Sequence, residues 1–257
     1  MTADAVIARI KAQLASQGIP WREGGRDTFK AGKPETDVRG IATSGMSTFD
    51  VLRRAAKDGK NLVITHEPTF YNDRDVTTTL QSDPVYQAKQ RFIAEHDLVV
   101  WRFHDHAHAM RPDPLVAGSA RALGWTQYAS PNDPRLYVLP ETTLGELAAA
   151  VAKKLDDRAI RIVGDPAMKV TRVTLGPGYG IPALGAAVDV SIGGEISESG
   201  SNTEYALDAA AAGQPKAMIM LGHMMSEDHG MKEVADWLRT FLTGVPVAFI
   251  PAGEPFS

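Results

Sequence analysis

The sequence predicts an α/β protein, and two observations carry that prediction. Short apolar runs of the kind that form buried strands alternate with longer segments whose apolar residues recur every three or four positions. Glycine, proline and capping residues separate these segments along the whole chain. A chain of 257 residues can form one large domain or two intimate lobes around a sizeable core.

In the first half of the chain, apolar periodicity predicts the helices and compact apolar runs predict the strands. Ile10 and Leu14 mark the first helix, Ser47 is the expected cap of the second, and Asp83 followed by Pro84 predicts the start of the third. The expected helices span residues 3–17, 48–57, 84–96 and 113–123, and the expected strands span 38–43, 61–65 and 98–103. The polar residues 22–38 predict an exposed loop that could act as a mobile flap.

The pattern starts anew near Trp125, which makes this point the best candidate for a lobe boundary. Thr143 and Glu146 have the spacing of a capping box and predict a helix that begins there. The glycine-rich segment 176–180 is expected to form a tight turn. The remaining expected strands span residues 136–139, 159–163, 170–175, 188–193, 217–221 and 247–250, and the remaining expected helices span 183–187, 203–212 and 230–242.

Composition excludes several classes of function. Apolar residues make up 44% of the chain and charged residues 23%, as in ordinary soluble globular proteins. A net charge of -4 without any basic run argues against nucleic acid as a partner. The absence of cysteine excludes disulfides, thiolate zinc sites and iron–sulfur clusters. No apolar stretch suggests a signal peptide or a membrane span, so we expect a cytoplasmic protein that binds no membrane.

Four clusters of histidines and acids follow predicted strands. They are His66-Glu67, then His104, Asp105, His106 and His108, then Glu195, and finally His223 with Glu227. Ligands of open α/β sheets collect at the carboxyl ends of the strands, where these clusters would meet. A single histidine at such a place is more often structural, but four clusters in register favour a metal site. Imidazole and carboxylate ligands suit Zn, Fe, Mn, Co or Ni.

The spacing within two clusters predicts which side chains face the same way. His104, His106 and His108 alternate, so they would point to one side of an extended segment but not of a turn. His223 and Glu227 are four residues apart, which brings them together if a helical turn begins there.

Several of these motifs resemble those of the Nif3-like (DUF34) dinuclear metal proteins. Thr65-His66-Glu67-Pro68 is similar to that family's Thr-His-His-Pro motif, and Gly222-His223 with Glu227 is similar to its Gly-His-x-x-x-Glu motif. Gly194-Glu195-Ile196 matches part of its Thr-Gly-Glu-Ile segment, and His104 to His108 falls where the family has His-x-x-x-Asp. The four motifs occur in the family's order, from about residue 40 to the end of the chain.

Two departures from the family pattern compensate each other. The family's second histidine is Glu67 here, and its aspartate falls on His108. The resemblance therefore implies an exchanged ligand set of three histidines and two acids. Its members are His66, Glu67, His108, His223 and Glu227. Asp105 could instead supply the second acid if the loop has a different register.

The resemblance also implies an architecture and a chemistry. It implies two α/β lobes with helices packed on central sheets, two divalent metal ions per chain in the cleft between the lobes, and a homohexamer. We expect residues 1–124 to form the first lobe, 125–215 the second, and 216–257 to complete the first lobe and supply ligands.

A two-metal centre predicts a hydrolase that activates water for attack on a small amide, cyclic amide or phosphoester. His104 and His106 are the candidates for moving protons, and an orienting role is the alternative for each. Two other functions remain open. One is a metal-binding or regulatory protein without turnover, and the other is an enzyme similar to GTP cyclohydrolases.

Overall fold

The computed structural model describes residues 1–185 and 187–256, which form two compact units. Unit 1 contains Met1–Pro114 and Gly230–Ala252, and unit 2 contains Leu115–His229 and the chain from Gly253 on. The expected lobes 1–124, 125–215 and 216–257 stay a prediction. In the part of the chain described, no helix is both long enough and apolar enough to cross a membrane.

Unit 1 is built on a five-stranded sheet in which four strands are parallel. The order is β1 (Phe29–Ala31), β4 (Val99–Arg102), β3 (Leu62–Thr65), β2 (Ile41–Ser44) and β10 (Val247–Phe249), with β1 antiparallel to its neighbour. Every residue of β2, β3 and β4 is buried, as expected for parallel strands covered on both faces.

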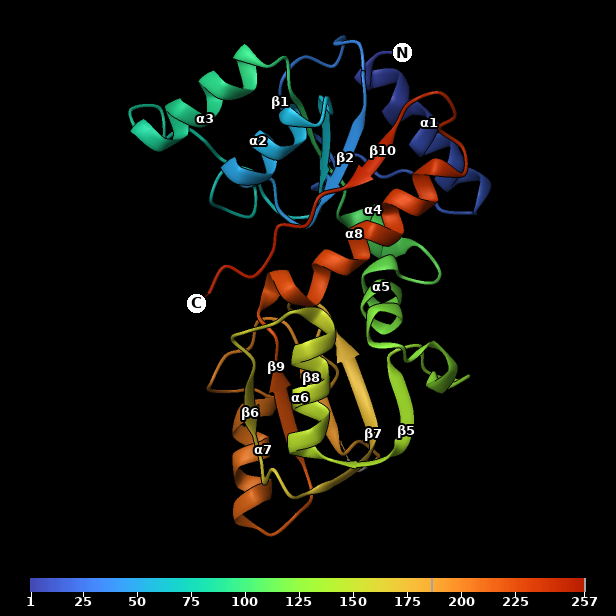
Figure 1. Ribbon diagram of the computed structural model, residues 1–257, viewed down its shortest axis with the longest axis vertical. Coiled ribbons are helices and arrows are strands. Elements are labelled where there is room, and N and C mark those ends of the chain that lie inside the picture. The colour runs from blue at the N-terminus through green and yellow to red at the C-terminus, as the bar shows by residue number, and fades with distance from the viewer. Residues whose placement is uncertain (186, 257) are drawn as a thin grey trace. The chain divides into compact units, whose positions relative to one another are not determined.

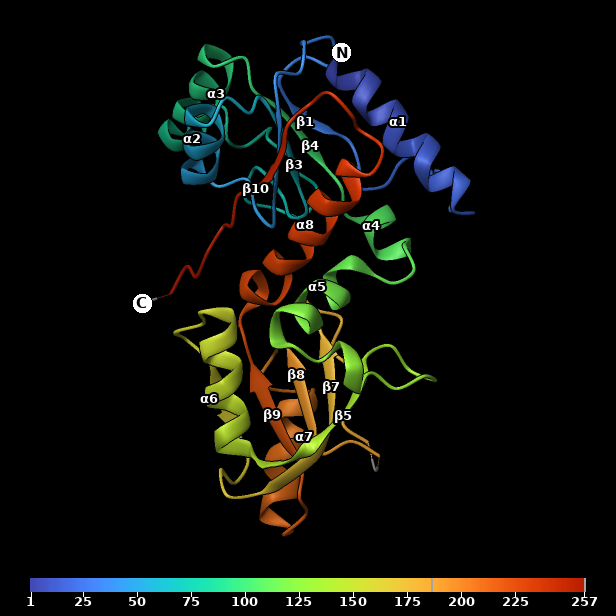
Figure 2. The same ribbon diagram turned by 45° about the vertical axis from the view of Figure 1, so that its right-hand side comes forward.

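Helices cover the two faces of this sheet, as Figures 1 and 2 show. The helices of unit 1 are α1 (Ala3–Ser16), α2 (Phe49–Lys57), α3 (Pro84–Glu95), the short α4 (Asp105–Ala109), and α8 (His223–Arg239) from Gly230 on. On one face Leu52 of α2 and Ile93 of α3 share an apolar cluster with Val63 and Val100. On the other face Thr43 donates a hydrogen bond of 2.7 Å to the carbonyl of Met231 in α8.

Unit 2 has a second five-stranded sheet with three parallel strands at its centre. The order is β5 (Leu136–Thr143), β7 (Lys169–Gly176), β8 (Val190–Gly193), β9 (Ala217–Met220) and β6 (Arg161–Val163), and the two outer strands are antiparallel. Helix α6 (Leu144–Leu155) packs Leu147 and Val151 against Val173 and Ile219 of the sheet. Helix α7 (Asn202–Ala211) packs Ala206 against Met218, whose side chain lies on the opposite face. Helix α5 (Pro114–Leu123) and the 3₁₀ turn Thr126–Tyr128 precede β5.

The α/β class is confirmed, and so are the two predicted helix starts that rest on specific capping residues. The side chain of Asp83 caps α3, and Thr143 with Glu146 forms the capping box of α6. The predicted cap Ser47 is wrong, because Thr48 caps α2 and the Ser47 hydroxyl donates to Thr69.

Three other expectations differ from the structure. Strand β1 forms within residues 22–38, where only a loop was expected. The strand was missed because it forms by pairing with β4, which is distant in sequence. Helix α8 begins at His223 rather than near residue 230. Of the short helix expected at 183–187, residues 183–185 are not helical, and residue 186 lies outside the described residues.

Candidate metal centre

His66 and His104 meet because two neighbouring parallel strands end at the same edge of the sheet in unit 1. Strand β3 ends at Thr65, strand β4 ends at its partner Arg102, and a histidine follows each strand within two residues. The two imidazole rings stack with their centroids 4.5 Å apart and their planes 22° apart. Within unit 1, the expected convergence of histidines at strand ends is therefore present.

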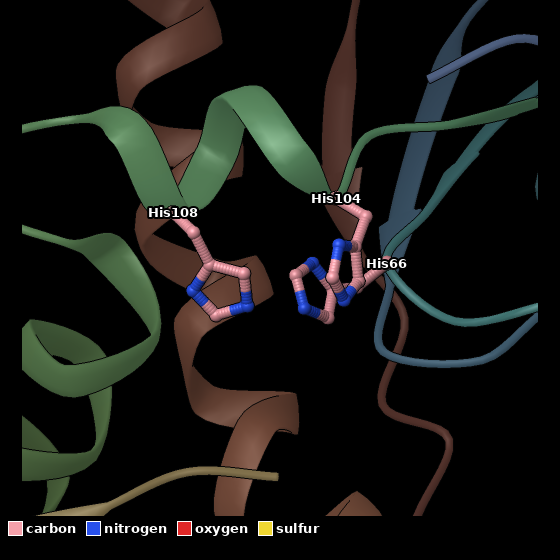
Figure 3. Close-up of side chains that lie close together, drawn as sticks. All are labelled: His66, His104 and His108. Carbon is pink, nitrogen blue, oxygen red and sulfur yellow. The ribbon is translucent and has the colours of Figure 1, made fainter. Parts of the chain in front are cut away.

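Helix α4 brings the third histidine to the same place. His104 is the residue before the helix, and one helical turn places His108 on the same side. The His108 ring lies 4.9 Å from each of the other two rings and nearly perpendicular to both, at 77°. Figure 3 shows the three rings turned toward one another. We call His66, His104 and His108 the three-histidine cluster. The alternating geometry of an extended segment is absent here, because residues 105–109 are helical.

Hydrogen bonds fix the ring nitrogen that each histidine of the cluster can offer. Nδ1 of His66 contacts the carbonyl oxygen of Phe103 at 3.1 Å, Nδ1 of His104 contacts Asp105 at 2.9 Å, and Nδ1 of His108 contacts Asp113 at 3.0 Å. Since these oxygens can only accept, each Nδ1 carries the proton and each Nε2 carries a lone pair. One nitrogen from each ring lies within 4.8 Å of the others.

The carboxylate of Glu67 adds an oxygen to these nitrogens. Its Oε1 lies 3.7 Å from Nε2 of His104 and 4.0 Å from Nε2 of His66. Its Oε2 accepts a hydrogen bond of 3.3 Å from Arg102, whose guanidinium is buried and also donates to the carbonyl of His66. Lone pairs of two nitrogens and one oxygen thus converge, and their mutual repulsion favours a bound cation.

Electrostatics keep two of these imidazoles neutral, which is the form that binds metal. Burial lowers the pKa of His66 well below its ordinary value, and the neighbouring His104 and His108 lower it further. Burial also lowers the pKa of His104, against the opposing hydrogen bond to Asp105. The side chain of His66 is fully buried, whereas those of His104 and His108 are 20% and 33% exposed.

His106, which the sequence offered as a proton carrier, lies outside the three-histidine cluster. Its Nδ1 contacts Asp27 at 2.5 Å, its Nε2 accepts from the backbone N–H of Arg22 at 3.0 Å, and its ring stacks on Trp21 at 3.8 Å. Both ring nitrogens are thus used within the fold, which favours the orienting role over proton transfer to a substrate.

Asp27 is a site residue that the sequence analysis missed. Its carboxylate accepts the backbone N–H groups of His104, Asp105 and His106 at 2.5, 3.0 and 2.9 Å, so it holds the N-terminus of α4. Arg22, Arg26 and Asp27 thus connect the segment 22–38, which was expected as an exposed loop, to α4. No sequence motif marks Asp27, because its partners lie almost 80 residues away.

Asp105 contacts the Nδ1 side of His104 and also accepts hydrogen bonds from the backbone and guanidinium of Arg26. Burial alone would raise the pKa of Asp105, but the hydrogen bonds from Arg26 and His104 outweigh it and lower that pKa to about 2. Asp105 is therefore a charged residue that orients His104.

Unit 2 holds the second group of predicted ligands at the start of α8. Nδ1 of His223 contacts Glu195 at 3.0 Å, and its Nε2 lies 3.2 Å from Glu227, one helical turn later. If Nδ1 donates to Glu195, two acceptor atoms face each other at 3.2 Å, and a proton or a metal ion is needed between them. The predicted pairing of His223 with Glu227 through a helical turn is confirmed.

The absence of a side chain at Gly178 leaves room for His223 and Glu227. A Cβ atom at residue 178 would lie 2.3 Å from Oε1 of Glu227 and 3.2 Å from Nε2 of His223. The residue also has a φ of +59°, a conformation that side chains other than glycine rarely adopt. The expected turn at 176–180 is therefore also a wall of the candidate site in unit 2.

Comparison with known families shows which family the chain belongs to. The family model described as Duf34/NIF3 (NGG1p interacting factor 3) matches residues 21–255. The chain belongs to the Duf34/NIF3 family. No curated protein matches the sequence.

Solved structures share the fold of this Duf34/NIF3 chain at low sequence identity. Protein SA1388 of Staphylococcus aureus is 18% identical with a TM-score of 0.74, and the match covers 100% of this chain and 99% of that one. A Bacillus cereus protein related to NIF3 is 15% identical with a TM-score of 0.73, covering 100% and 99%. Reduced HcgD from Methanocaldococcus jannaschii is 16% identical with a TM-score of 0.62, covering 97% of each chain. At such identities these matches show the fold alone.

Proposed function

We propose that this Duf34/NIF3 protein is a metal-dependent hydrolase that binds two divalent ions per chain. One observation carries the proposal, namely that in unit 1 a carboxylate oxygen of Glu67 lies 4.0 Å from Nε2 of His66 and a ring nitrogen of His108 lies within 4.8 Å of one of His66. Because all three atoms are acceptors in the neutral-imidazole state, a divalent cation is the partner that suits them.

The proposed ligands fall into one group in each unit. Unit 1 would supply His66, Glu67 and His108, with Asp105 as the alternative acid, and unit 2 would supply His223 and Glu227. The expectation that both ions form a dinuclear centre rests on the family resemblance. Nitrogen-rich ligands without sulfur suit Zn, Fe, Mn, Co or Ni.

The protein's own residues would prepare these ligands for hydrolysis. Bound divalent ions lower the pKa of a coordinated water and polarise a carbonyl or phosphoryl oxygen. Arg102 would keep one oxygen of Glu67 away from the ligand position, while Asp113 and Glu195 would hold the orientation of His108 and His223.

A cavity beside His223 in unit 2 supports the proposal that the substrate is small. Its volume is about 290 Å³, and Glu195, Tyr179 and Asn202 are among the residues that line it. None of the described residues that line this cavity is basic, whereas a triphosphate would need cationic partners. The cavity therefore favours an amide or cyclic amide, whose N–H groups would donate hydrogen bonds to Glu195, over the GTP cyclohydrolase alternative.

The test combines metal analysis with a substrate panel. Purified protein would be analysed for metal per chain and assayed on amides, lactams and phosphoesters before chelation, after chelation and after metal return. Turnover that disappears and returns with the metal would support the hydrolase. Stoichiometric metal without turnover on the whole panel would favour the alternative of a binding or regulatory protein.

We also propose a homohexamer, on the family resemblance alone. Light scattering of the purified protein should give a mass near six chains. A stable monomer at micromolar concentration would contradict this assembly.

A further inference from the structure

We infer that Asp157 and Glu254 share one proton and so form a pH-sensitive clasp, which holds the end of the chain on unit 2. We call this pair the carboxyl clasp. Both residues belong to unit 2, and Glu254 lies in the segment after Ala252, where the chain returns to that unit. The inference does not depend on the proposed metal binding or hydrolysis, since the candidate ligands take no part in it.

Asp157 is held in one place by the end of helix α6. The helix ends at Leu155, and Asp156 after it has a left-handed φ of +55° that turns the chain. The backbone N–H of Asp157 donates to the carbonyl of Ala152 at 2.9 Å, and its Oδ1 accepts the N–H of Ala159 at 2.9 Å. Because the residue is also only 4% exposed, its carboxylate cannot turn into solvent without breaking these bonds.

The last part of the chain brings Glu254 to Asp157. Oε1 of Glu254 accepts the backbone N–H of Phe256 at 2.9 Å, and the N–H of Gly253 donates to Oδ2 of Asp228 in α8 at 3.2 Å. With the backbone fixed in this way, the carboxyl group of Glu254 lies within hydrogen-bonding reach of that of Asp157.

Each member of the carboxyl clasp keeps one buried oxygen without a donor. These oxygens are Oδ2 of Asp157 and Oε2 of Glu254. An ionised carboxylate can only accept hydrogen bonds, so two ionised groups would repel each other and leave both buried acceptors unsatisfied. One proton shared by the pair removes a negative charge and supplies the missing donor. Paired carboxylates in proteins commonly titrate in this way.

The pH range of the clasp follows from the surroundings of Asp157. Burial is the main cause that raises the pKa of Asp157, and Glu254 raises it further, to about 6, while the N–H of Ala159 opposes both. The released segment would leave Asp157 closer to its usual value of 3.8. Since the docked form then binds the proton more tightly, docking strengthens as the pH falls from 7 toward 4. Between pH 7 and pH 5 the docking equilibrium should change about tenfold.

Other charged groups lie around the carboxyl clasp. Asp228 of α8 approaches the tail through the N–H of Gly253. The charged side chains beside Asp157 in the sequence are exposed, and solvent and salt screen their effect on a buried carboxyl group. They are Lys153, Lys154, Asp156 and Arg158. We therefore assign the pH response to Asp157 and Glu254.

The experiment measures hydrogen–deuterium exchange of the C-terminal peptide in the full-length protein at pH 5 and pH 7, with and without EDTA. The N–H groups of Gly253 and Phe256 report closure, because their acceptors are Asp228 and Glu254. A synthetic peptide of the same sequence gives the exchange rate of the released segment at each pH. The protection relative to this peptide is thus free of the direct effect of pH on exchange.

Two variants remove the shared proton and keep a hydrogen bond. Glu254→Gln and Asp157→Asn each replace a carboxyl group by an amide, which donates at every pH. Asp208→Asn is the matched control, because Asp208 is an exposed acid of α7 in the same unit. Glu254→Gln is the decisive variant, since a change near the end of the chain leaves the bonds that end α6 in place.

The expected result is a pH dependence that only the clasp variants lose. The wild type and Asp208→Asn should be protected about tenfold more at pH 5 than at pH 7, and Glu254→Gln and Asp157→Asn equally at both. Equal protection of the wild type at the two pH values, or a tenfold change that persists in Glu254→Gln, would overturn the inference. Loss of the protection at pH 5 in EDTA would also overturn it, since a cation rather than a proton would then join the two carboxylates.

Discussion

The two units present candidate metal ligands of different origin. In unit 1, the candidate ligands come from the ends of two strands and from α4. Phe103, beyond the end of the second strand, anchors His66, and Asp27, in a distant part of the chain, holds the N-terminus of α4. In unit 2, His223 and Glu227 come from one turn of α8, and Glu195, which holds His223, is about half exposed. The geometry of unit 1 depends on tertiary structure, whereas that of unit 2 depends largely on a local helix.

This difference predicts that substituting the residues that hold the candidate ligands in place has larger effects on stability and metal binding in unit 1. The largest should come from Asp27→Ala, which deprives three backbone N–H groups and His106 of their acceptor. Each lost partner of a buried group costs about 1–3 kcal/mol, so we expect a loss of about 3 kcal/mol in the free energy of unfolding. Urea denaturation would measure it, with Asp58→Ala, at an exposed residue just after α2 in the same unit, as the control. A loss no larger than that of Asp58→Ala would show that α4 does not depend on Asp27.

Removing the carboxylate that holds Nδ1 of a candidate ligand should weaken metal binding more in unit 1 than in unit 2. Asp113→Ala should weaken metal binding in unit 1 by roughly 10–100-fold, because partners of metal-bound histidines have effects of this size. Glu195→Ala should lie at the low end, roughly 10-fold, since its carboxylate is more exposed. Competition with a chromophoric chelator would give both affinities. A larger effect for Glu195→Ala would reverse the comparison.

The buried Lys89 should make the free energy of unfolding of unit 1 depend on pH. Lys89 is buried and donates a hydrogen bond of 2.6 Å to the carbonyl of Thr69, just after Glu67. Burial lowers the pKa of Lys89 to about 8 from its usual 10.5. Since the unfolded chain binds the proton more tightly, the cost of the buried charge is full below pH 8 and decreases as the pH rises toward 10.5.

The comparison of wild type with Lys89→Met would test this. Their difference in free energy of unfolding should change by about 2 kcal/mol between pH 7 and pH 10, in favour of the wild type at the higher pH. The pH dependence common to both proteins cancels in that difference. A difference that is constant across this range would mean that Lys89 is not desolvated.

The smallest effect should come from unit 2. Gly178→Ala places a methyl group against Glu227 and imposes a positive φ on alanine, at a cost of about 1 kcal/mol in the free energy of unfolding. It should also lower the occupancy of unit 2 and leave that of unit 1 unchanged. Thermal unfolding and metal analysis would measure the two effects, and an unchanged unit 2 occupancy would show that Glu227 can shift away.

Local signals in the sequence predicted local structure well. The capping box at Thr143 and the Asp83-Pro84 helix start are confirmed, because both involve residues three or fewer positions apart. The order of motifs around His66 and His223 indicated the family, which the match over residues 21–255 confirms. Strand β1 escaped prediction, since it depends on pairing with β4, which a short window of sequence does not contain. Helix α8 begins at His223, earlier than expected.

The sequence by itself determined the inventory of the candidate site: four motifs in order, no cysteine, and histidines and acids at the ends of predicted strands. Only the tertiary structure decided how the residues of the His104–His108 segment divide. Helix α4 turns His104 and His108 toward His66, and it turns His106 toward Asp27. The reason is physical, since a segment of alternating histidines can be extended or helical, and the acceptor that stabilises the helix lies in a remote part of the chain.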